Sequence, residues 1–330
     1  MQNYGKYKRI MSRNDEQMLS RFFSGNRAVL ARMISRVEND RAVSDKVLDH
    51  IFQQVKGAYR IGITGPPGAG KSTLVDRLVS DFRKQEKTVG VIAIDPTSPF
   101  TGGALLGDRI RMASNLGDPG VFIRSMATRG SLGGLAHTTQ EAADVMDAFG
   151  LDVIILETVG VGQSELDIVE AADTVIVVLV PESGDSIQAM KAGLMEIGDI
   201  FVLNKSDHEN ADQAYMELSS VLSLKYGHGQ WNLKVIQTVA HEAKGLDELM
   251  REIRSHWEYL SGNGKLERKQ RDRIRKRLKI KLERKLKSDF WTENRKDLFE
   301  IFVTRLLNKE ISYAEAIKKL FEPELTDKKL

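Results

Sequence analysis

Apolar residues recur with two different periods along this chain of 330 residues. Between residues 59 and 260, short runs of aliphatic and β-branched residues are separated by segments of helical spacing. Strands that are apolar on both faces and separated by helices are typical of a parallel sheet covered on both sides. We therefore predict an α/β domain over residues 59–260. Its strand candidates are RIGIT, TVGVIAID, VFIRSM, LDVIILET, DTVIVVLV, DIFVLNK and LKVIQTV.

Helical spacing without strand candidates marks both flanks of this domain. Apolar positions in residues 15–56 predict an N-terminal helical arm over residues 1–58. After the turn SGNGK, the composition shifts to that of a helical C-terminal region, residues 261–330. The fold class is thus an α/β domain with a helical extension at each end.

The C-terminal region begins with a segment rich in Lys and Arg, residues 265–288. Acidic residues interrupt this charge, and apolar residues recur every four positions, which predicts an amphipathic helix with an apolar seam. We interpret residues 261–330 as a dimerisation region. Binding of RNA or a ribosome and a plain solvated face remain alternatives. The seam residues are Ile274, Leu278, Leu282 and Leu286.

Composition excludes several kinds of site. The chain has no cysteine, which rules out disulfides, thiolate metal sites and cysteine nucleophiles. Its six histidines show no ligand spacing, so we expect neither a zinc nor a nickel site. The longest apolar run, around Thr174 to Val180, is too short to cross a bilayer, and no stretch resembles a signal peptide. We predict a cytoplasmic protein, and its net charge of +3 makes no case for nucleic acid.

A phosphate-binding loop joins the first strand candidate to a helix. The residues GPPGAGKS match the pattern G-x-x-x-x-G-K-[ST], whose backbone N–H groups face an anion at a helix N-terminus. We expect Lys71 to reach the outer phosphates and the Ser72 hydroxyl to bind Mg²⁺. An ordinary glycine-rich turn is the alternative, but the preceding strand and following helix favour a nucleotide. The predicted phosphate-site residues are Gly65, Pro66, Pro67, Gly68, Ala69, Gly70, Lys71, Ser72 and Thr73.

The base is selected by a second motif, VLNKSD, at the end of another strand candidate. We expect Asp207 to accept hydrogen bonds from the N1–H and the exocyclic amine of guanine. Asn204 is expected to meet the other edge of the base, and Lys205 to lie along the ring. Adenine lacks the N1–H and would leave a desolvated carboxylate unpaired, at a cost of about 1 to 3 kcal/mol. The motif therefore predicts specificity for guanine nucleotides.

Three carboxylates suit a magnesium ion, which prefers hard oxygen ligands. Glu157 ends a strand candidate, and Gly160 follows three residues later, where most GTPases carry Asp-x-x-Gly. We expect Glu157 to hold Mg²⁺ and the Gly160 N–H to sense the γ-phosphate. Asp95 ends the strand VIAID, and Asp108 follows downstream, where a helix N-cap is the alternative. The predicted metal residues are Ser72, Asp95, Asp108 and Glu157.

Hydrolysis is expected to be slow in the isolated protein. Val161 follows Gly160, where Ras-like enzymes place the glutamine that orients the attacking water. An apolar side chain cannot orient water, so the site depends on groups supplied by a switch segment or a partner. Each candidate can equally be a surface or interface side chain. The candidates are Gln163, Arg109, Arg111 and Lys191, which join Lys71, Glu157 and Gly160 as predicted catalytic residues.

Five segments resemble one family of GTPase chaperones, called MeaB or ArgK, which includes the LAO-transport ATPase-like proteins and MMAA. They are GPPGAGKSTL, AIDPTSPFTGGALLGDRIRM, SMATRGSLGGLA, ETVGVGQSE and IQAMKAGLMEIGDIFVLNKSD, and the likeness covers about residues 15–320. The resemblance implies a homodimeric GTPase of the signal-recognition-particle and MinD-like class. It also implies assistance to a B12-dependent acyl-CoA mutase, usually methylmalonyl-CoA mutase.

Proteins of this family gate delivery of adenosylcobalamin to the mutase and protect or reactivate it, so the resemblance implies that adenosylcobalamin belongs to the partner. The resemblance also implies a cobalamin adenosyltransferase as a further partner. By the same resemblance, residues 95–112, 157–169 and 182–191 match three switch segments, and Asp95, Asp108 and Glu157 match the magnesium-region acids.

The chain departs from the family where a loop caps the base. Val239 and Ala240 stand in that loop, where relatives usually show a Ser-Ala pair. This contact is largely made by the backbone. The difference therefore bears on the affinity for the nucleotide more than on the specificity for its base. Two other functions remain open: an ATPase or kinase serving amino-acid transport, against which the N-K-x-D motif argues, and a ribosome- or RNA-associated GTPase.

Overall fold

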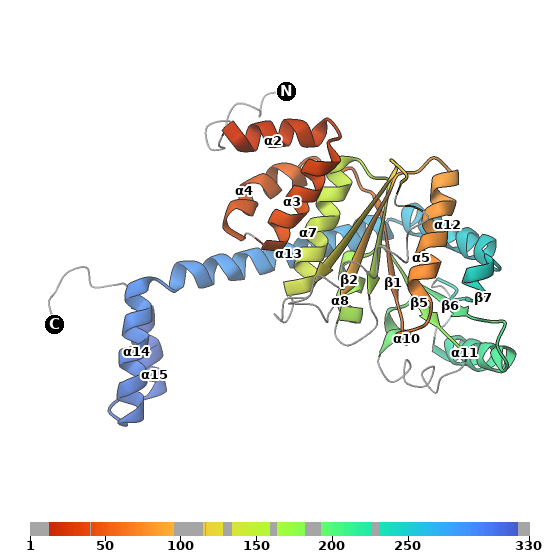
Figure 1. Ribbon diagram of the computed structural model, residues 1–330. Coiled ribbons are helices and arrows are strands. Elements are labelled where there is room, and N and C mark those ends of the chain that lie inside the picture. Colours follow the sequence, from red (N-terminus) through yellow and green to blue (C-terminus); the bar gives the residue numbers. More distant parts are fainter. Residues whose placement is uncertain are drawn as a thin grey trace. The chain divides into compact units, whose positions relative to one another are not determined.

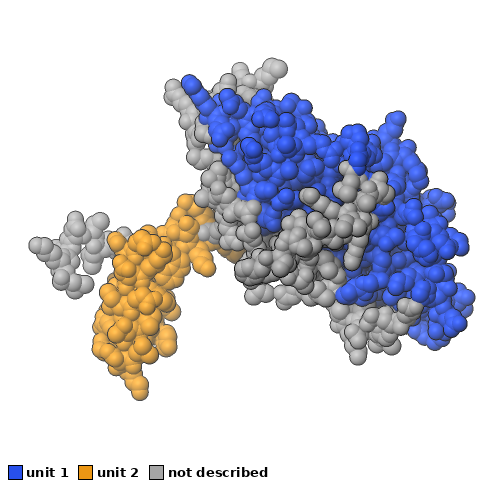
Figure 2. Space-filling view, in the orientation of Figure 1, with its two compact units in different colours: residues 1–269 blue, residues 270–330 orange. Residues whose placement is uncertain are grey.

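The computed structural model describes residues 13–39, 41–95, 115, 117–127, 134–158, 164–181, 193–225 and 231–322. The chain forms two compact units, residues 1–269 and residues 270–330 (Figure 2). Among the residues described, no helix is both long and apolar enough to cross a membrane.

The first unit is built on a seven-stranded sheet in which every strand pairing is parallel (Figure 1). The strand order is β3-β2-β4-β1-β5-β6-β7. The carboxyl ends of parallel strands meet at one edge, so the loops that follow them gather there. The predicted α/β fold is confirmed. The strands are β1 (Tyr59–Thr64), β2 (Val89–Asp95), β3 (Val121–Ala127), β4 (Val153–Thr158), β5 (Thr174–Leu179), β6 (Ile200–Asn204) and β7 (Val235–Thr238).

Alternate residues of the central strands enter two separate hydrophobic clusters. On one face, Ile61 and Ile63 pack with helices α5 (Lys71–Lys84) and α12 (Leu246–Gly262). On the other, Val175 and Val177 share a cluster with helices of the opposite layer. Helix α8 approaches β1 closely at Gly62, where a Cβ would lie 3.0 Å from Ile168 Cγ1. The opposite layer contains α7 (Gly134–Phe149), α8 (Ser164–Ala171), α10 (Leu194–Ile197) and α11 (Ala211–Lys225).

The N-terminal helices bury their apolar faces in the same layer as α7. They are α2 (Arg13–Phe23), α3 (Arg27–Asn39) and α4 (Arg41–Phe52). Phe22 is fully buried, and its ring centroid lies 5.3 Å from that of Phe149 on α7. The helices that we expected as an N-terminal arm therefore share the core of the sheet domain and belong to its compact unit.

A buried charge cluster fixes the chain where these helices lead into the sheet. The Arg60 guanidinium lies 2.7 Å from Asp144 Oδ1 and 3.5 Å from Asp147 Oδ2. The Asp147 carboxylate also accepts backbone hydrogen bonds from Lys56 (2.7 Å), Gly57 (3.1 Å) and Ala58 (2.9 Å). Burial lowers the pKa of Arg60, but the neighbouring carboxylates outweigh burial and raise it above its ordinary value.

A second buried polar cluster lies at the amino ends of β5 and β6. His256 is only 1% exposed, and its Nδ1 lies 2.8 Å from Thr174 Oγ1, which contacts the Tyr59 hydroxyl. Its Nε2 lies 3.6 Å from Asp199 Oδ1. Lys269, in the first turns of α13 (Lys265–Phe290), donates to the Asp173 carbonyl at 2.6 Å. This cluster therefore anchors the start of α13 to the sheet.

The unfolding free energy is expected to fall by about 3 kcal/mol between pH 6.5 and pH 4 through His256 alone. Burial lowers the pKa of His256 from 6.5 to about 4; Asp199 and Asp173 oppose this shift, whereas Lys269 and Lys265 add to it. Between these values the unfolded chain binds a proton that the folded chain does not, so stability is complete above pH 6.5 and is lost as the pH falls. Urea unfolding of wild type and His256→Asn across this range measures the effect. Equal pH dependence in both would contradict it.

The second unit is helical, as expected. It contains the rest of α13 with α14 (Glu293–Leu307) and α15 (Tyr313–Phe321), which are capped by Thr292 and Ser312. A small core holds these helices together, formed by Phe302, Ile311, Ala316 and Leu320. The predicted seam of α13 is exposed: Ile274 (51%), Leu278 (67%), Leu282 (54%) and Leu286 (59%).

Candidate functional site

The phosphate-binding loop lies between the central strand β1 and the N-terminus of α5. Two of its glycines are required by close contacts. At Gly65, with φ of +138°, a Cβ would lie 2.0 Å from the Val178 carbonyl oxygen of β5. At Gly70, with φ of +87°, a Cβ would lie 2.3 Å from the Asn204 side-chain nitrogen. The loop can therefore pack tightly against β5 and β6 only without side chains at these positions.

Lys71 begins α5, yet its ammonium turns back over the loop. Lys71 is 6% exposed, and its Nζ donates to the carbonyl oxygens of Gly65 (2.8 Å) and Pro66 (2.9 Å). A positive charge is thus held beside the helix N-terminus, where backbone N–H groups already favour an anion. This arrangement can bind phosphate groups.

Two of the predicted metal residues are brought together at the end of β4. The Ser72 hydroxyl donates to Glu157 Oε1 at 2.6 Å, and Glu157 is 6% exposed. A hydroxyl and a carboxylate at this distance form a donor set that suits Mg²⁺. The described residues contain no cluster of three or more His, Asp or Glu side chains able to hold a metal. A magnesium site built on Ser72 and Glu157 therefore needs further oxygen ligands, such as phosphates and water.

Asp95 ends β2, the strand beside β4. Ala93 is the register partner of Glu157, so the Asp95 backbone lies two residues further along the neighbouring strand. Several predicted residues lie outside the described part of the chain. They are Asp108, Arg109, Arg111, Gly160, Gln163 and Lys191.

Asn204, at the end of β6, joins the two halves of the site. Its side chain is buried: Nδ2 donates to the Ala69 carbonyl at 2.8 Å, and Oδ1 accepts from the Thr238 hydroxyl and the Ala240 N–H, both at 3.1 Å. The phosphate loop and the loop predicted to cap the base are thus linked through one amide. The N-K-x-D motif predicts only a base contact for Asn204. Its bridging role is possible because Gly70 has no side chain: a Cβ there would lie 2.3 Å from the Asn204 amide nitrogen.

The loop around the predicted base site is held in place from α5 as well. Arg77 donates from Nε to the Ala240 carbonyl (3.2 Å) and from Nη2 to the His241 carbonyl (2.9 Å). Arg77 belongs to no sequence motif, so its role in holding this loop could not be predicted from the sequence. Lys205 has a left-handed backbone with φ of +58°, and the Asp207 side chain beyond it is 39% exposed. Asp207 is therefore accessible to a ligand, whereas Asn204 is buried.

Comparisons with known proteins agree with this geometry. Residues 30–295 match the family model described as methylmalonyl-CoA mutase-associated GTPase MeaB. A putative GTPase of Pyrococcus abyssi is 50% identical over 299 residues, which cover 90% of this chain and 92% of the relative. A mitochondrial methylmalonic aciduria type A homolog of Caenorhabditis elegans is 33% identical over 282 residues, covering 80% of this chain and 71% of the relative.

A solved structure extends the likeness to nearly the whole chain. The crystal structure of a LAO/AO transport system kinase superposes with a TM-score of 0.69 at 26% identity, covering 95% of this chain and 98% of that one. The family match spans both the phosphate loop and the N-K-x-D motif. This chain is therefore a GTPase that belongs to the MeaB family of methylmalonyl-CoA mutase-associated GTPases.

Proposed function

We propose that this GTPase binds GTP together with Mg²⁺ at the carboxyl edge of the sheet. The observation that carries the proposal is the hydrogen bond of 2.6 Å between Ser72 and Glu157, beside the Lys71 ammonium. Lys71 would exchange its two carbonyl partners for the outer phosphates. When bound, the metal would neutralise charge on the phosphates. Ser72 and Glu157 would position it between α5 and β4.

The guanine base would be held by the residues that follow β6 and β7. We assign Asp207 to the N1–H and exocyclic amine of guanine, with Lys205 along the ring and the Val239–Ala240 backbone at its edge. Arg77 and Asn204 hold that backbone in place through the Ala240 carbonyl and N–H. Because this loop is braced from two elements, little ordering is needed when the base binds.

We further propose that the GTPase cycle assists a B12-dependent acyl-CoA mutase. Methylmalonyl-CoA mutase is the partner that we propose. The family description and the name of the nematode relative support this partner. In this proposal the nucleotide state gates delivery of adenosylcobalamin, which stays with the mutase, and protects or reactivates that enzyme. A cobalamin adenosyltransferase would be a further partner. Residues 261–330 would form the homodimer, and the exposed seam of α13 is a suitable surface for it.

A second candidate function comes from the name of the structural neighbour, a LAO/AO transport system kinase. It would require ATP as substrate. A carboxylate at position 207 favours guanine over adenine. It can accept hydrogen bonds from the N1–H and the exocyclic amine of guanine, and adenine does not present this pair of donors. Competition of ATP against bound GDP separates the two candidates: displacement at similar concentrations of ATP and GTP would favour the kinase.

Adding methylmalonyl-CoA mutase is expected to accelerate GTP hydrolysis at least about tenfold, which is about 1.4 kcal/mol of transition-state stabilisation. The isolated chain has Val161 where a water-orienting glutamine would stand. A partner can therefore supply the group that orients the attacking water. Single-turnover hydrolysis with and without mutase measures this. Mutase affinity should also differ between the GDP and GTP-analogue forms by about 5 to 150-fold.

An acyl-CoA enzyme without cobalamin is the control for that experiment and should change neither the hydrolysis rate nor the nucleotide dependence of binding. If no B12-dependent mutase alters the rate, and each binds both nucleotide forms equally, the partner assignment fails. The assignment of GTP hydrolysis to this site would stand in that case.

A further inference from the structure

An arginine in the middle of α5 reaches the loop that follows β7, residues 239–245, which we call the base loop. Arg77 donates from Nε to the Ala240 carbonyl at 3.2 Å and from Nη2 to the His241 carbonyl at 2.9 Å. Arg77 follows Lys71 by six residues, which at about 1.5 Å per residue is about 9 Å along the helix axis. One helix therefore carries the phosphate-site residues at its start and a contact to the base loop in its middle.

The base loop is closed by its own backbone. Val239 and Lys244 exchange two backbone hydrogen bonds, at 3.1 and 3.3 Å. Ala243, between them, has a left-handed backbone with φ of +61°, and its N–H donates to the Ala240 carbonyl at 3.3 Å. Because the turn is tied together in this way, a hydrogen bond made at Ala240 positions the whole loop.

Ala240 is held from two sides. Its N–H donates to Asn204 Oδ1 at 3.1 Å, while its carbonyl accepts from Arg77. The nitrogen of the same Asn204 amide donates to the Ala69 carbonyl in the phosphate loop at 2.8 Å, and that loop leads directly into α5. These contacts form a closed ring, which runs from α5 through Arg77 to the base loop and returns through Asn204 and the phosphate loop.

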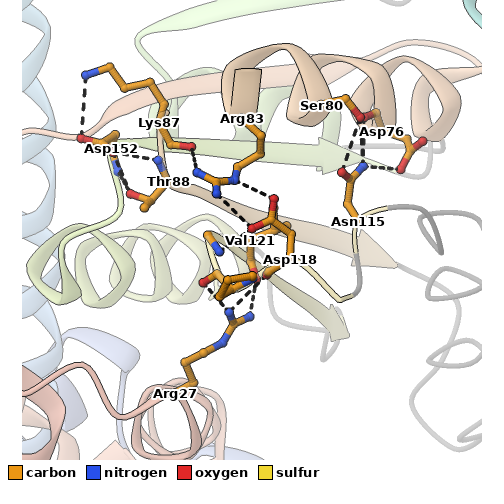
Figure 3. Close-up of polar contacts among 12 residues, drawn as sticks. Arg27, Asp76, Ser80, Arg83, Lys87, Thr88, Asn115, Asp118, Val121 and Asp152 are labelled. Carbon is orange, nitrogen blue, oxygen red and sulfur yellow. Dashed lines mark hydrogen bonds and ion pairs between the residues drawn. The ribbon is translucent and has the colours of Figure 1, made fainter. Parts of the chain in front are cut away.

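A second arginine of α5 makes its contacts at the other edge of the sheet. Arg83 donates to both carboxylate oxygens of Asp118, at 2.8 and 3.0 Å, and to the Lys87 carbonyl at 2.8 Å (Figure 3). Asp118 and Lys87 precede β3 and β2, so these contacts lie at the amino ends of the strands. Arg77 instead fastens α5 to a loop at the carboxyl ends, where the nucleotide site lies.

We propose that Arg77 is a positioning residue for the guanine base, which slows the release of bound nucleotide by closing this ring. A loop that is already held in its bound position loses little further freedom when the base binds. Differences in affinity between variants of one binding site arise mostly in the dissociation rate. This inference rests on the proposed guanine site at Asp207 and the base loop.

The test removes the donors of Arg77 and keeps its apolar stem. Arg77→Met should release fluorescent GDP about tenfold faster than wild type, and Arg77→Lys, which keeps the charge and one donor group, about threefold faster. The GTP concentration for half-maximal single-turnover hydrolysis should rise about tenfold in Arg77→Met, whereas the rate at saturating GTP should fall less than about threefold. A fall in the saturating rate as large as the rise in half-maximal concentration would overturn the inference, because the effect would then lie on the chemical step.

Inorganic triphosphate with Mg²⁺ tests whether Arg77 acts through the base, because this ligand fills the phosphate site alone. Calorimetric titration should give the same triphosphate affinity for wild type and Arg77→Met within about twofold. A loss of triphosphate affinity equal to the loss of GDP affinity would overturn the inference, since the substitution would then distort the phosphate site itself.

Arg83→Met is the matched control, because it removes an arginine with three hydrogen bonds from the same helix. Its GDP release rate should stay within about twofold of wild type. Equal acceleration in Arg83→Met and Arg77→Met would mean a general loosening of α5 and would overturn the inference.

Asp207→Asn separates this inference from the base site on which it rests. If Asp207→Asn weakens GTP binding and Arg77→Met releases GDP at the wild-type rate, only the role of Arg77 is wrong. If neither variant changes the binding of guanine nucleotides, the base lies elsewhere and both assignments fail. Faster release in Arg77→Met with unchanged triphosphate affinity, together with weaker GTP binding in Asp207→Asn, supports both.

Discussion

Replacing Asp207 by Asn is expected to weaken GTP binding at least about 100-fold and to create binding of xanthosine triphosphate. The carboxylate can accept two hydrogen bonds from guanine, and each charged hydrogen bond contributes about 1.5 to 3 kcal/mol. An amide loses that pairing but can donate to the oxygen that xanthine carries in place of the amine. Because Asp207 is 39% exposed, the substitution leaves the core untouched. Competition of each nucleotide against fluorescent GDP measures the change.

Asp212→Asn is the matched control, since Asp212 is exposed in the first turn of the neighbouring helix α11. It should bind GTP like wild type. Retained GTP affinity in Asp207→Asn would place the base elsewhere and remove the main argument for guanine specificity from this motif.

Asp147→Ala is expected to lower the unfolding free energy by about 3 to 5 kcal/mol. The Asp147 side chain is 1% exposed and accepts hydrogen bonds from three backbone N–H groups in residues 56–58. Removing it leaves those part-buried donors without their acceptor and takes one carboxylate from the buried Arg60 guanidinium. Urea unfolding followed by circular dichroism measures the loss.

An exposed carboxylate provides the comparison. Asp212→Ala should change the unfolding free energy by less than about 1 kcal/mol. Asp147→Asn should fall between the two alanine variants, because an amide oxygen can still accept from part of the loop. A loss below about 1 kcal/mol in Asp147→Ala would mean that the cluster contributes little to holding the N-terminal helices on the sheet.

Local patterns were sufficient to predict the sheet and the phosphate loop. All seven strand candidates correspond to strands, because each is a short apolar run bounded by polar or turn residues. The phosphate loop is equally local, since its glycines, Lys71 and Ser72 are contiguous and lie between β1 and α5. The approach of Ser72 to Glu157 agrees with the prediction that both are metal ligands, a role that stays a prediction, although they lie 85 positions apart in the sequence.

Contacts that depend on tertiary packing were not predictable in the same way. Arg77 has an ordinary side chain in no motif, and only the packing of α5 reveals its partners. The N-terminal helices show the same limit: their apolar periodicity indicates a buried face but does not indicate that α7 covers it. The bridging role of Asn204 was hidden for another reason, since its place in a known motif suggested a different contact.

The contact between Gly70 and Asn204 means that two signatures 134 residues apart cannot change independently. A methyl group at position 70 would occupy the space of the Asn204 amide, 2.3 Å away, whatever nucleotide is bound. A relative with a side chain at position 70 would need a smaller residue at position 204, and would then lose the link between the phosphate and base loops. Transplanting either motif into another protein thus requires transplanting both.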